Sequence, residues 1–157
     1  MSLDKDERYT LPSTVAAIKK LAGVEAFDLD AAACAESHHA LAYFTKEANG
    51  LERPWFGAVF VNPPFSELEA WVSKAMFEMD SGRCSSVAMV LPENRREQPW
   101  WQELVEPFRD FASPANPWTL RSHTLPGRVR FGSPGDPAGT KAGSPNFGTC
   151  VLVWRNS

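Results

Sequence analysis

The sequence predicts an α/β fold: a mainly parallel sheet with helices on both faces and an antiparallel hairpin at the C-terminal end. Helical and strand patterns alternate along most of the chain, and two strand patterns follow one another at its end. The runs at 57–62 and 85–92 are apolar almost throughout, as parallel strands covered on both faces require. A length of 157 residues suits a single domain, which we expect over 1–157.

The first third of the chain is expected to hold two helices and short strands. Residues 13–23 carry a helical apolar stripe and end in Gly23, a residue type that commonly closes helices. A short strand that ends in acidic residues is expected at 24–30. An alanine-rich helix with a strand at its end is expected at 31–44, followed by a turn at 45–50.

The clearest helical pattern of the chain covers 66–82, after the first buried strand. Ser66 is expected to cap this helix, with Glu69 at the capping-box position. Its apolar residues recur at helical spacing and form one face. The later elements are expected to be a second buried strand, a helix and the two hairpin strands, at 85–92, 95–108, 127–134 and 147–156.

A segment dense in Gly, Pro and Ser at 132–146 separates the two hairpin strands. Its composition predicts a mobile surface loop. The net charge of the chain is −3, yet residues 111–157 hold five cations and one anion. On this signal alone, ordinary solvated charge is the favoured interpretation, and a face that contacts phosphates is the alternative.

The composition excludes several classes of protein. The chain is 43% hydrophobic and 22% charged, which is typical of a globular protein. No stretch approaches ~20 apolar residues, so no membrane span is expected, and residues 1–12 lack the apolar centre of a secretory signal. Cys34, Cys84 and Cys150 lie far apart, which predicts a reduced cytoplasmic protein without a disulfide or metal site.

The first buried strand stops at Asn62-Pro63-Pro64-Phe65. Each proline fixes its own φ and keeps the preceding residue extended, so the stop is a rigid bracket. The side-chain carbonyl of Asn62 and the main-chain carbonyl of Pro63 can converge on one amine that carries two hydrogens. Phe65 can stack on a planar ring. The alternative is a turn that ends the strand and tucks Phe65 into the core.

These groups suit chemistry on an aromatic amine, whose lone pair is delocalised into its ring. Two acceptors on the two N–H groups favour a pyramidal nitrogen and free the lone pair for attack on an electrophile. No strong base is needed before the attack, because the proton can leave afterwards. Most of the catalysis is therefore positioning.

Asn62-Pro63-Pro64-Phe65 resembles the catalytic motif of amino-group methyltransferases that use S-adenosylmethionine. The chain is similar to the small phage and prophage DNA N6-adenine methyltransferases, the phage Dam-like family. The resemblance implies a Rossmann-like methyltransferase fold and methylation of a flipped-out adenine in double-stranded DNA. It rests on stretches that occur in the family's order: FDLDAAACAES, YFTKEANGL, VFVNPPFS, VLPENRREQPWW and GRVRFGSP with FGTCVLVW.

The resemblance places the methionine end of the cofactor beside the turn after the strand at 24–30. It assigns Asp28, Asp30 and Ala31 to this end. The turn reads DAAACAES and holds no glycine, unlike the common methyltransferase form. The alternative role of Asp28 and Asp30 is to cap the expected helix.

Three further cofactor contacts are implied by the resemblance. Asn49 would lie near the adenine of the cofactor, although Asn-Gly is also a strong turn dipeptide. Glu47 would reach the ribose hydroxyls. Thr10 belongs to an N-terminal Thr-Pro element that closes over the cofactor, here with Leu11 inserted before Pro12.

Basic residues are expected on the side that faces DNA. Arg95 and Arg96 follow the second buried strand and would rim the target pocket. Arg128, Arg130 and Lys141 would contact phosphates. The alternative for Arg128 and Arg130 is that they solvate an edge strand. Three histidines without a partner pattern are expected at the surface: His38, His39 and His123.

Two alternatives to DNA adenine methylation stay open. The same motif serves amine methylation of cytosine at N4, of RNA bases and of protein glutamine. A glutamine has no aromatic ring, so Phe65 and the basic segment favour a nucleobase. The second alternative is an inactive relative that binds DNA, which cofactor binding would distinguish from an enzyme.

Overall fold

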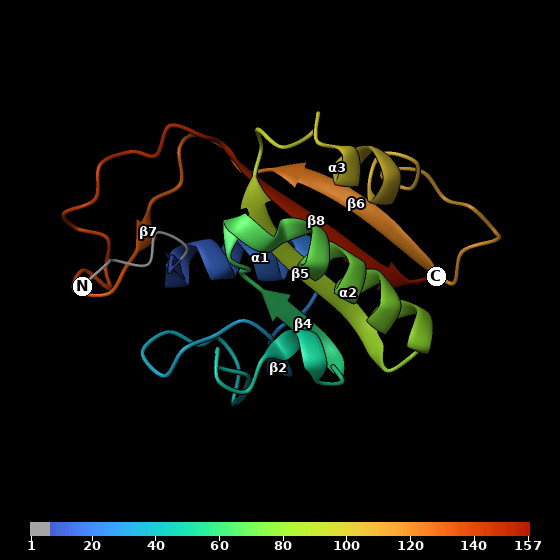
Figure 1. The fold of residues 1–157 in the computed structure, drawn as a ribbon, viewed down its shortest axis with the longest axis horizontal. Coiled ribbons are helices and arrows are strands. Elements are labelled where there is room, and N and C mark those ends of the chain that lie inside the picture. The colour runs from blue at the N-terminus through green and yellow to red at the C-terminus, as the bar shows by residue number, and fades with distance from the viewer. Residues whose placement is uncertain (1–6) are drawn as a thin grey trace.

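The computed structural model describes residues 7–157. Its centre is a six-stranded sheet in the order β3-β2-β4-β5-β8-β6 (Figure 1). Strands β3, β2, β4 and β5 run parallel, and β8 is antiparallel to both of its neighbours. The mainly parallel sheet with an antiparallel C-terminal hairpin is confirmed. The strands are β2 (Leu29–Asp30), β3 (Ala42–Tyr43), β4 (Gly57–Val61), β5 (Cys84–Pro92), β6 (Trp118–Thr124) and β8 (Thr149–Asn156).

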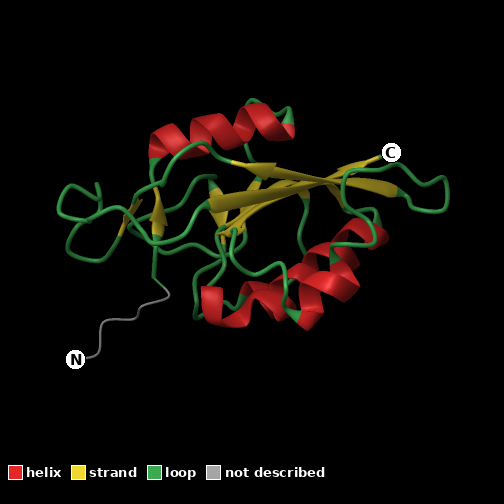
Figure 2. Cartoon of the chain, turned by 90° about the horizontal axis from the view of Figure 1, so that it is seen from above, coloured by secondary structure: helices red, strands yellow, loops and turns green. Residues whose placement is uncertain are grey.

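Helices cover both faces of the sheet, as expected (Figure 2). Helix α1 (Pro12–Ala22) packs on one face, and Gly23 closes it with a φ of 71°. Helices α2 (Leu68–Ser81) and α3 (Pro99–Leu104) lie against each other and share the opposite face. No helix in the described part of the chain is long and apolar enough to cross a membrane.

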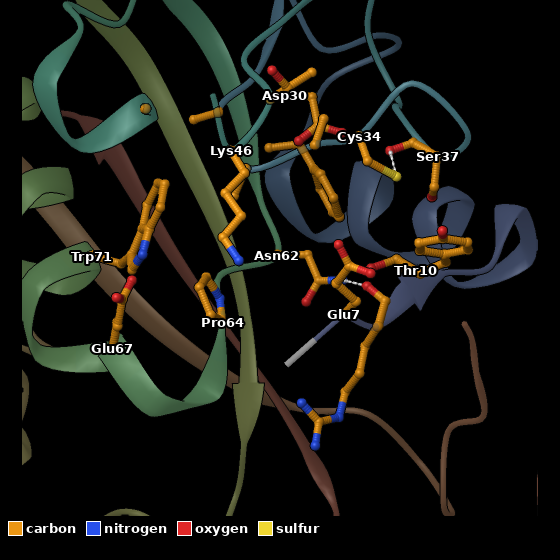
Figure 3. Close-up of a pocket in the computed structure, with 18 of the residues that line it drawn as sticks. Glu7, Thr10, Asp30, Cys34, Ser37, Lys46, Asn62, Pro64, Glu67 and Trp71 are labelled. Atoms are coloured by element: carbon orange, nitrogen blue, oxygen red, sulfur yellow. Dashed lines mark hydrogen bonds between the residues drawn. The ribbon is translucent and has the colours of Figure 1, made fainter. Parts of the chain in front are cut away.

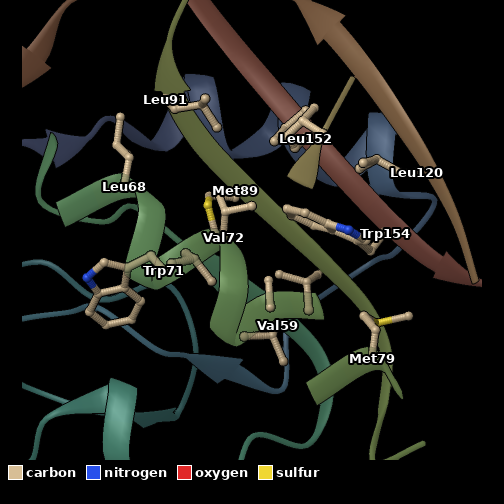
Figure 4. Close-up of a cluster of buried hydrophobic side chains, with 14 of the residues drawn as sticks. Val59, Leu68, Trp71, Val72, Met79, Met89, Leu91, Leu120, Leu152 and Trp154 are labelled. Carbon is tan, nitrogen blue, oxygen red and sulfur yellow. The ribbon is translucent and has the colours of Figure 1, made fainter. Parts of the chain in front are cut away.

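The central strands explain the apolar runs of the sequence. Successive side chains of a strand point to opposite faces. On β5, Val87 and Met89 belong to the core beneath α2, whereas Ala88 and Val90 belong to the core beneath α1. The α2 side is the larger core, and Trp154 of β8 is fully buried in it (Figure 4).

The direction in which successive strands are added to the sheet reverses between β2 and β4, although these two strands run parallel. The chain runs from β2 outward to β3 and then returns to form β4 on the other side of β2. Ligands of open α/β sheets bind outside the carboxyl ends of the strands at such a switch point. Asp30 ends β2 and Asn62 follows β4, so this geometry places the two polar side chains at one crevice.

The helix expected at 31–44 does not form. Its backbone groups bond partners that a helix would not provide: the N–H of Ala33 donates to the Phe44 carbonyl, and the N–H of Phe44 donates to the Asp30 carbonyl. Tertiary pairing therefore overrides the helical preference of the alanines. The strand expected at the end of this stretch does form, as β3.

The first hairpin strand lies earlier than the sequence predicts. The hairpin partner of β8 is β6, while the stretch at 127–134 contributes only β7 (Phe131–Gly132). Strand β7 pairs with β1 (Tyr9–Thr10) in a separate two-stranded sheet. Strand β6 is an edge strand whose polar side chains reach solvent, so its sequence lacks the apolar run that identified β4 and β5.

Two helix starts also differ from the prediction. A short 3₁₀ turn, η2 (Phe65–Glu67), precedes α2 and contains Ser66, so Ser66 is not the cap expected from the sequence. Helix α3 begins at Pro99, which sits in its first turn as expected, and it is shorter than the predicted 95–108.

Candidate active site

A cavity of about 380 Å³ opens at the carboxyl ends of β2 and β4. We call it the first cavity, and its volume lies within the range of small-molecule sites. Its wall combines the N-terminal segment, the turn after β2, the segment after β3, the end of β4 and the start of α2 (Figure 3). The lining residues used below are Arg8, Thr10, Asp30, Ala31, His39, Asn49, Gly50, Asn62, Pro64 and Trp71.

Several lining side chains hold buried polar atoms that have no hydrogen-bond partner among residues 7–157. Buried polar groups are normally paired, so a cluster of unpaired ones in one cavity indicates a polar ligand. They include both acceptors and donors, as a zwitterionic nucleoside would require. The atoms are Thr10 Oγ1, Asp30 Oδ1, His39 Nε2, Asn62 Oδ1 and Trp71 Nε1.

Asp30 is 1% exposed at the end of β2. Its Oδ2 accepts from the backbone N–H of His39 at 3.0 Å. Burial raises the pKa of Asp30 to about 7, and the backbone hydrogen bonds oppose this rise. The carboxyl therefore suits a cationic partner, which would stabilise its charged form.

His39 is not a surface residue, which corrects the prediction from the sequence. It is half-buried and lines the first cavity, with its ring edge-on to Phe60 at 5.2 Å between centroids. Burial lowers its pKa, so the neutral imidazole is favoured. No sequence pattern pointed to this position, because residues 31–44 were expected to form a helix and His39 had no partner pattern.

Asn62 is held in one orientation. Its Nδ2 donates to the Arg8 main-chain carbonyl at 2.6 Å (Figure 3). This bond fixes the side-chain amide and directs Oδ1 away from that partner. Pro63 is buried behind Asn62, and Pro64 lines the first cavity.

Phe65 lies beside the first cavity and does not line it. Its side chain is 9% exposed, with Phe131 and Phe147 edge-on at centroid distances of 6.4 and 5.6 Å. The guanidinium carbon of Arg8 lies over the Phe65 ring, 4.4 Å from its centroid. Phe65 therefore belongs to the core on the α2 side, as the alternative interpretation of the motif expected, and its stacking on a base stays a prediction.

The segment after β3 is fastened to the turn after β2. Asn49 adopts a left-handed conformation with a φ of 58°, which Asn tolerates better than most residues, and its Oδ1 accepts from the N–H of Leu51. Gly50 approaches so closely that a Cβ there would collide with the Ala31 carbonyl oxygen. Trp55 Nε1 donates to the Gly50 carbonyl at 2.8 Å. Asn49 therefore forms the expected turn and also lines the first cavity.

Two residues assigned to the cofactor from the sequence lie outside the lining of the first cavity. Asp28 accepts from the N–H of Ala58 at 2.8 Å, so its carboxylate helps to join β2 to β4. Glu47 is exposed. Thr10, Asp30, Ala31 and Asn49 do line the cavity.

Trp71 is a residue whose site position the sequence did not reveal. Its helical spacing placed it on the core face of α2, and it is indeed 5% exposed. Its indole Nε1 belongs to the polar atoms described above, so one edge of the ring faces the first cavity. An aromatic residue in the first turn of a helix that follows the motif is the signal that could have identified it.

The basic residues expected at the DNA face do not line the first cavity. Arg96 pairs with Glu93 at 2.9 Å and lies over the Trp101 ring, while Arg95 bonds to its neighbour Asn94. Strand β5 neighbours β4, so Arg95 and Arg96 do follow the strand beside the motif, as expected. Arg128, Arg130 and Lys141 are exposed.

The fold is that of a Rossmann-like methyltransferase. The crystal structure of the 23S rRNA methyltransferase ErmE superposes with a TM-score of 0.55, over 93% of this chain and 68% of that chain, at 13% identity. At this identity the likeness concerns the fold alone.

The chain belongs to the family described as DNA N-6-adenine-methyltransferase (Dam), whose family model matches residues 3–156. A relative from Escherichia phage T1, named DNA N-6-adenine-methyltransferase, is 34% identical over 80 residues. That match covers 49% of this chain and 32% of the relative, so it spans about a third of the relative's length.

Proposed function

We propose that the protein transfers a methyl group from S-adenosylmethionine to the exocyclic N6 of adenine in DNA. The observation that carries the proposal is Asn62 Oδ1: a buried acceptor, without a partner in the described chain, held at the end of β4 by the bond from Nδ2 to Arg8. Family membership and the name of the phage T1 relative support adenine as the acceptor.

The first cavity fits the cofactor. Asp30 Oδ1 would accept from the ammonium of the methionine end, beside the main chain of Ala31. Asn49 would lie at the adenine end. When bound, S-adenosylmethionine supplies a methyl group on a positively charged sulfur. The neighbouring carboxylate and neutral His39 would make this cavity favourable for a cation.

The bracket after β4 would position the acceptor amine. Asn62 Oδ1 and the Pro63 carbonyl would accept from its two hydrogens, and Phe65 would stack on the base. The bond from N6 to the methyl carbon would form as the bond from that carbon to sulfur breaks. One N6 proton then passes to water. The adenine must leave the duplex, because its amine cannot reach such a site while it is paired.

DNA contacts would come from the exposed basic residues. Arg128, Arg130 and Lys141 flank or belong to the segment at 132–146 and would meet phosphates. Arg95 would reach the rim of the acceptor site. Arg96 already pairs with Glu93, so its contribution would require that pair to open.

The test is incubation of the protein with unmethylated double-stranded DNA and S-adenosylmethionine labelled in the methyl group, followed by nucleoside analysis. Labelled N6-methyldeoxyadenosine is the expected product. Labelled N4-methyldeoxycytidine would show that the acceptor is cytosine instead. Label in RNA or protein alone would show that the acceptor is an RNA base or a protein side chain. Cofactor binding in calorimetry without transfer to any acceptor would identify an inactive relative.

A further inference from the structure

The ring proposed to receive the target base is already covered on one face. The Arg8 guanidinium lies over Phe65 with its central carbon 4.4 Å from the ring centroid. A guanidinium is planar and stacks on aromatic faces, as a nucleobase does. Phe131 and Phe147 pack against the same ring at interplanar angles of 89° and 73°.

The backbone of Arg8 is fixed independently of its side chain. Its carbonyl accepts from Asn62 Nδ2, and the next two residues form β1, which pairs Tyr9 with Gly132 and Thr10 with Phe131. Removing the side chain therefore leaves the orientation of Asn62 intact. The role of the Arg8 guanidinium can therefore be tested apart from the role of the Arg8 main chain.

A second cavity of about 330 Å³ lies on the other side of this segment. Its lining includes Phe131, Pro134, Pro145 and Phe147. Glu7 and Arg8 line both the first and the second cavity, so they separate the two. Phe65 lines neither cavity, but it packs against Phe131 and Phe147, two apolar residues that line the second cavity.

We propose that Arg8 closes the acceptor position in the absence of DNA, and that the target base enters from the second cavity by displacing its guanidinium from Phe65. The inference rests on the proposed function. Because base and guanidinium compete for one face, the apparent affinity for a base is reduced by the fraction of molecules in which Arg8 is stacked. This competition would select against unwanted bases. Only a base that also donates a hydrogen bond to Asn62 would offset the loss of the contact between Arg8 and Phe65.

The experiment measures the affinity for free adenosine by calorimetry, with saturating S-adenosylhomocysteine present so that adenosine cannot occupy the first cavity. Arg8→Ala is expected to bind adenosine about 2- to 30-fold more tightly than the wild type, which corresponds to loss of one cation–π contact. Arg8→Lys keeps the charge without the planar group, so its adenosine affinity is expected to lie between those of the wild type and Arg8→Ala. Arg121→Ala, which removes an exposed arginine of β6, is expected to match the wild type.

A second arm removes the ring. In a Phe65→Ala background, Arg8→Ala is expected to give no further gain, because the ring face for which guanidinium and base compete is absent. Equal adenosine affinity of wild type and Arg8→Ala, including no detectable binding by either, overturns the proposal, as does a gain that persists without Phe65. If Arg8→Ala does not fold, Arg8→Gln replaces it with the same criterion. Failure of wild type to bind S-adenosylhomocysteine overturns the proposed function itself.

Discussion

Asn62 combines a buried free acceptor with a fixed side-chain orientation. We predict that Asn62→Ala retains cofactor affinity and lowers methyl transfer by about 10²–10³, as loss of one preorganised contact at a transition state does. Single-turnover transfer and calorimetry on the same samples measure the two effects. Asn156→Ala, an exposed change at the end of β8, serves as control. Unchanged turnover in Asn62→Ala would remove Asn62 from the catalytic site.

Asp30 should make cofactor binding depend on pH. Burial raises its pKa to about 7, so the carboxylate that would hold the ammonium is increasingly populated as the pH rises from 6 to 8. We predict that the affinity for S-adenosylhomocysteine rises over this interval. Asp30→Asn should lose the pH dependence and bind about 10- to 100-fold more weakly, because a hydrogen bond to a charged group is lost. Calorimetry across the pH series measures both.

The same carboxyl has the opposite effect on the cofactor-free protein. Between pH ~4 and 7 the folded state holds the Asp30 proton while the unfolded chain has lost it, so stability should fall as the pH rises. Urea unfolding should therefore show that Asp30→Asn is no less stable than the wild type at pH 8. A clear loss of stability there would mean that Asp30 serves the fold more than the ligand.

The short turn η1 (Gly50–Glu52) forms one wall of the first cavity through the approach of Gly50 to Ala31. A Cβ at Gly50 must push this wall away from β2. We predict that Gly50→Ala weakens cofactor binding at least tenfold and lowers the melting temperature. Gly143→Ala is the matched control, because a Cβ there meets no atom within 4 Å. Equal binding by the two variants would show that this wall does not shape the site.

The segment at 132–146 is less featureless than its composition predicts. The Asp136 carboxylate accepts from the N–H groups of Thr140 and Lys141, and Ser133 and Asp136 form a small bridge. Its mobility without DNA stays a prediction. Hydrogen exchange should show whether binding of DNA protects it.

We predict that neutralising Arg128, Arg130 and Lys141 together weakens binding to all DNA sequences alike and flattens the salt dependence. Phosphate contacts release counterions and carry no direct sequence information. The control neutralises three exposed cations on other elements: Lys20, Arg53 and Arg121. Binding across a salt series compares the two triple variants. A salt slope that flattens in the test variant and is unchanged in the control variant supports the assignment. An unchanged slope in both triple variants would place the DNA-binding face at Arg95 and its neighbours.

For the molecule as a whole, binding at the switch point should stabilise the sheet that builds it. A ligand present at 100 times its Kd adds about 2.7 kcal/mol to the free energy of unfolding. For a chain of this size we predict a rise in melting temperature of about 5–10 °C with S-adenosylhomocysteine. Asn62→Ala should keep this rise and Asp30→Asn should lose most of it. A rise of equal size in both variants would contradict the division of roles.

The elements with strong local patterns were predictable. The buried strands β4 and β5, helix α1 with its closing Gly23, and α2 after the motif all follow from apolar periodicity and from residues with special backbone preferences. The bracket at Asn62 was also predictable, because proline restricts the backbone at its own position and the one before it. The acidic end of β2 and the polar stop after β4 were each predictable, whereas their adjacency comes from the strand order of the sheet.

Long-range pairing decided the rest. Residues 31–44 have the composition of a helix, yet their backbone bonds to β2 and to the chain after β3, and this places His39 in the first cavity. Strand β6, the hairpin partner of β8, is an edge strand with few apolar residues, so a local sequence pattern does not reveal it. Arg8 reaches Phe65 because β1 pairs with β7 far along the chain. Sequence patterns report the exposure of each element, whereas contacts between distant segments depend on the free energy of the complete packed structure.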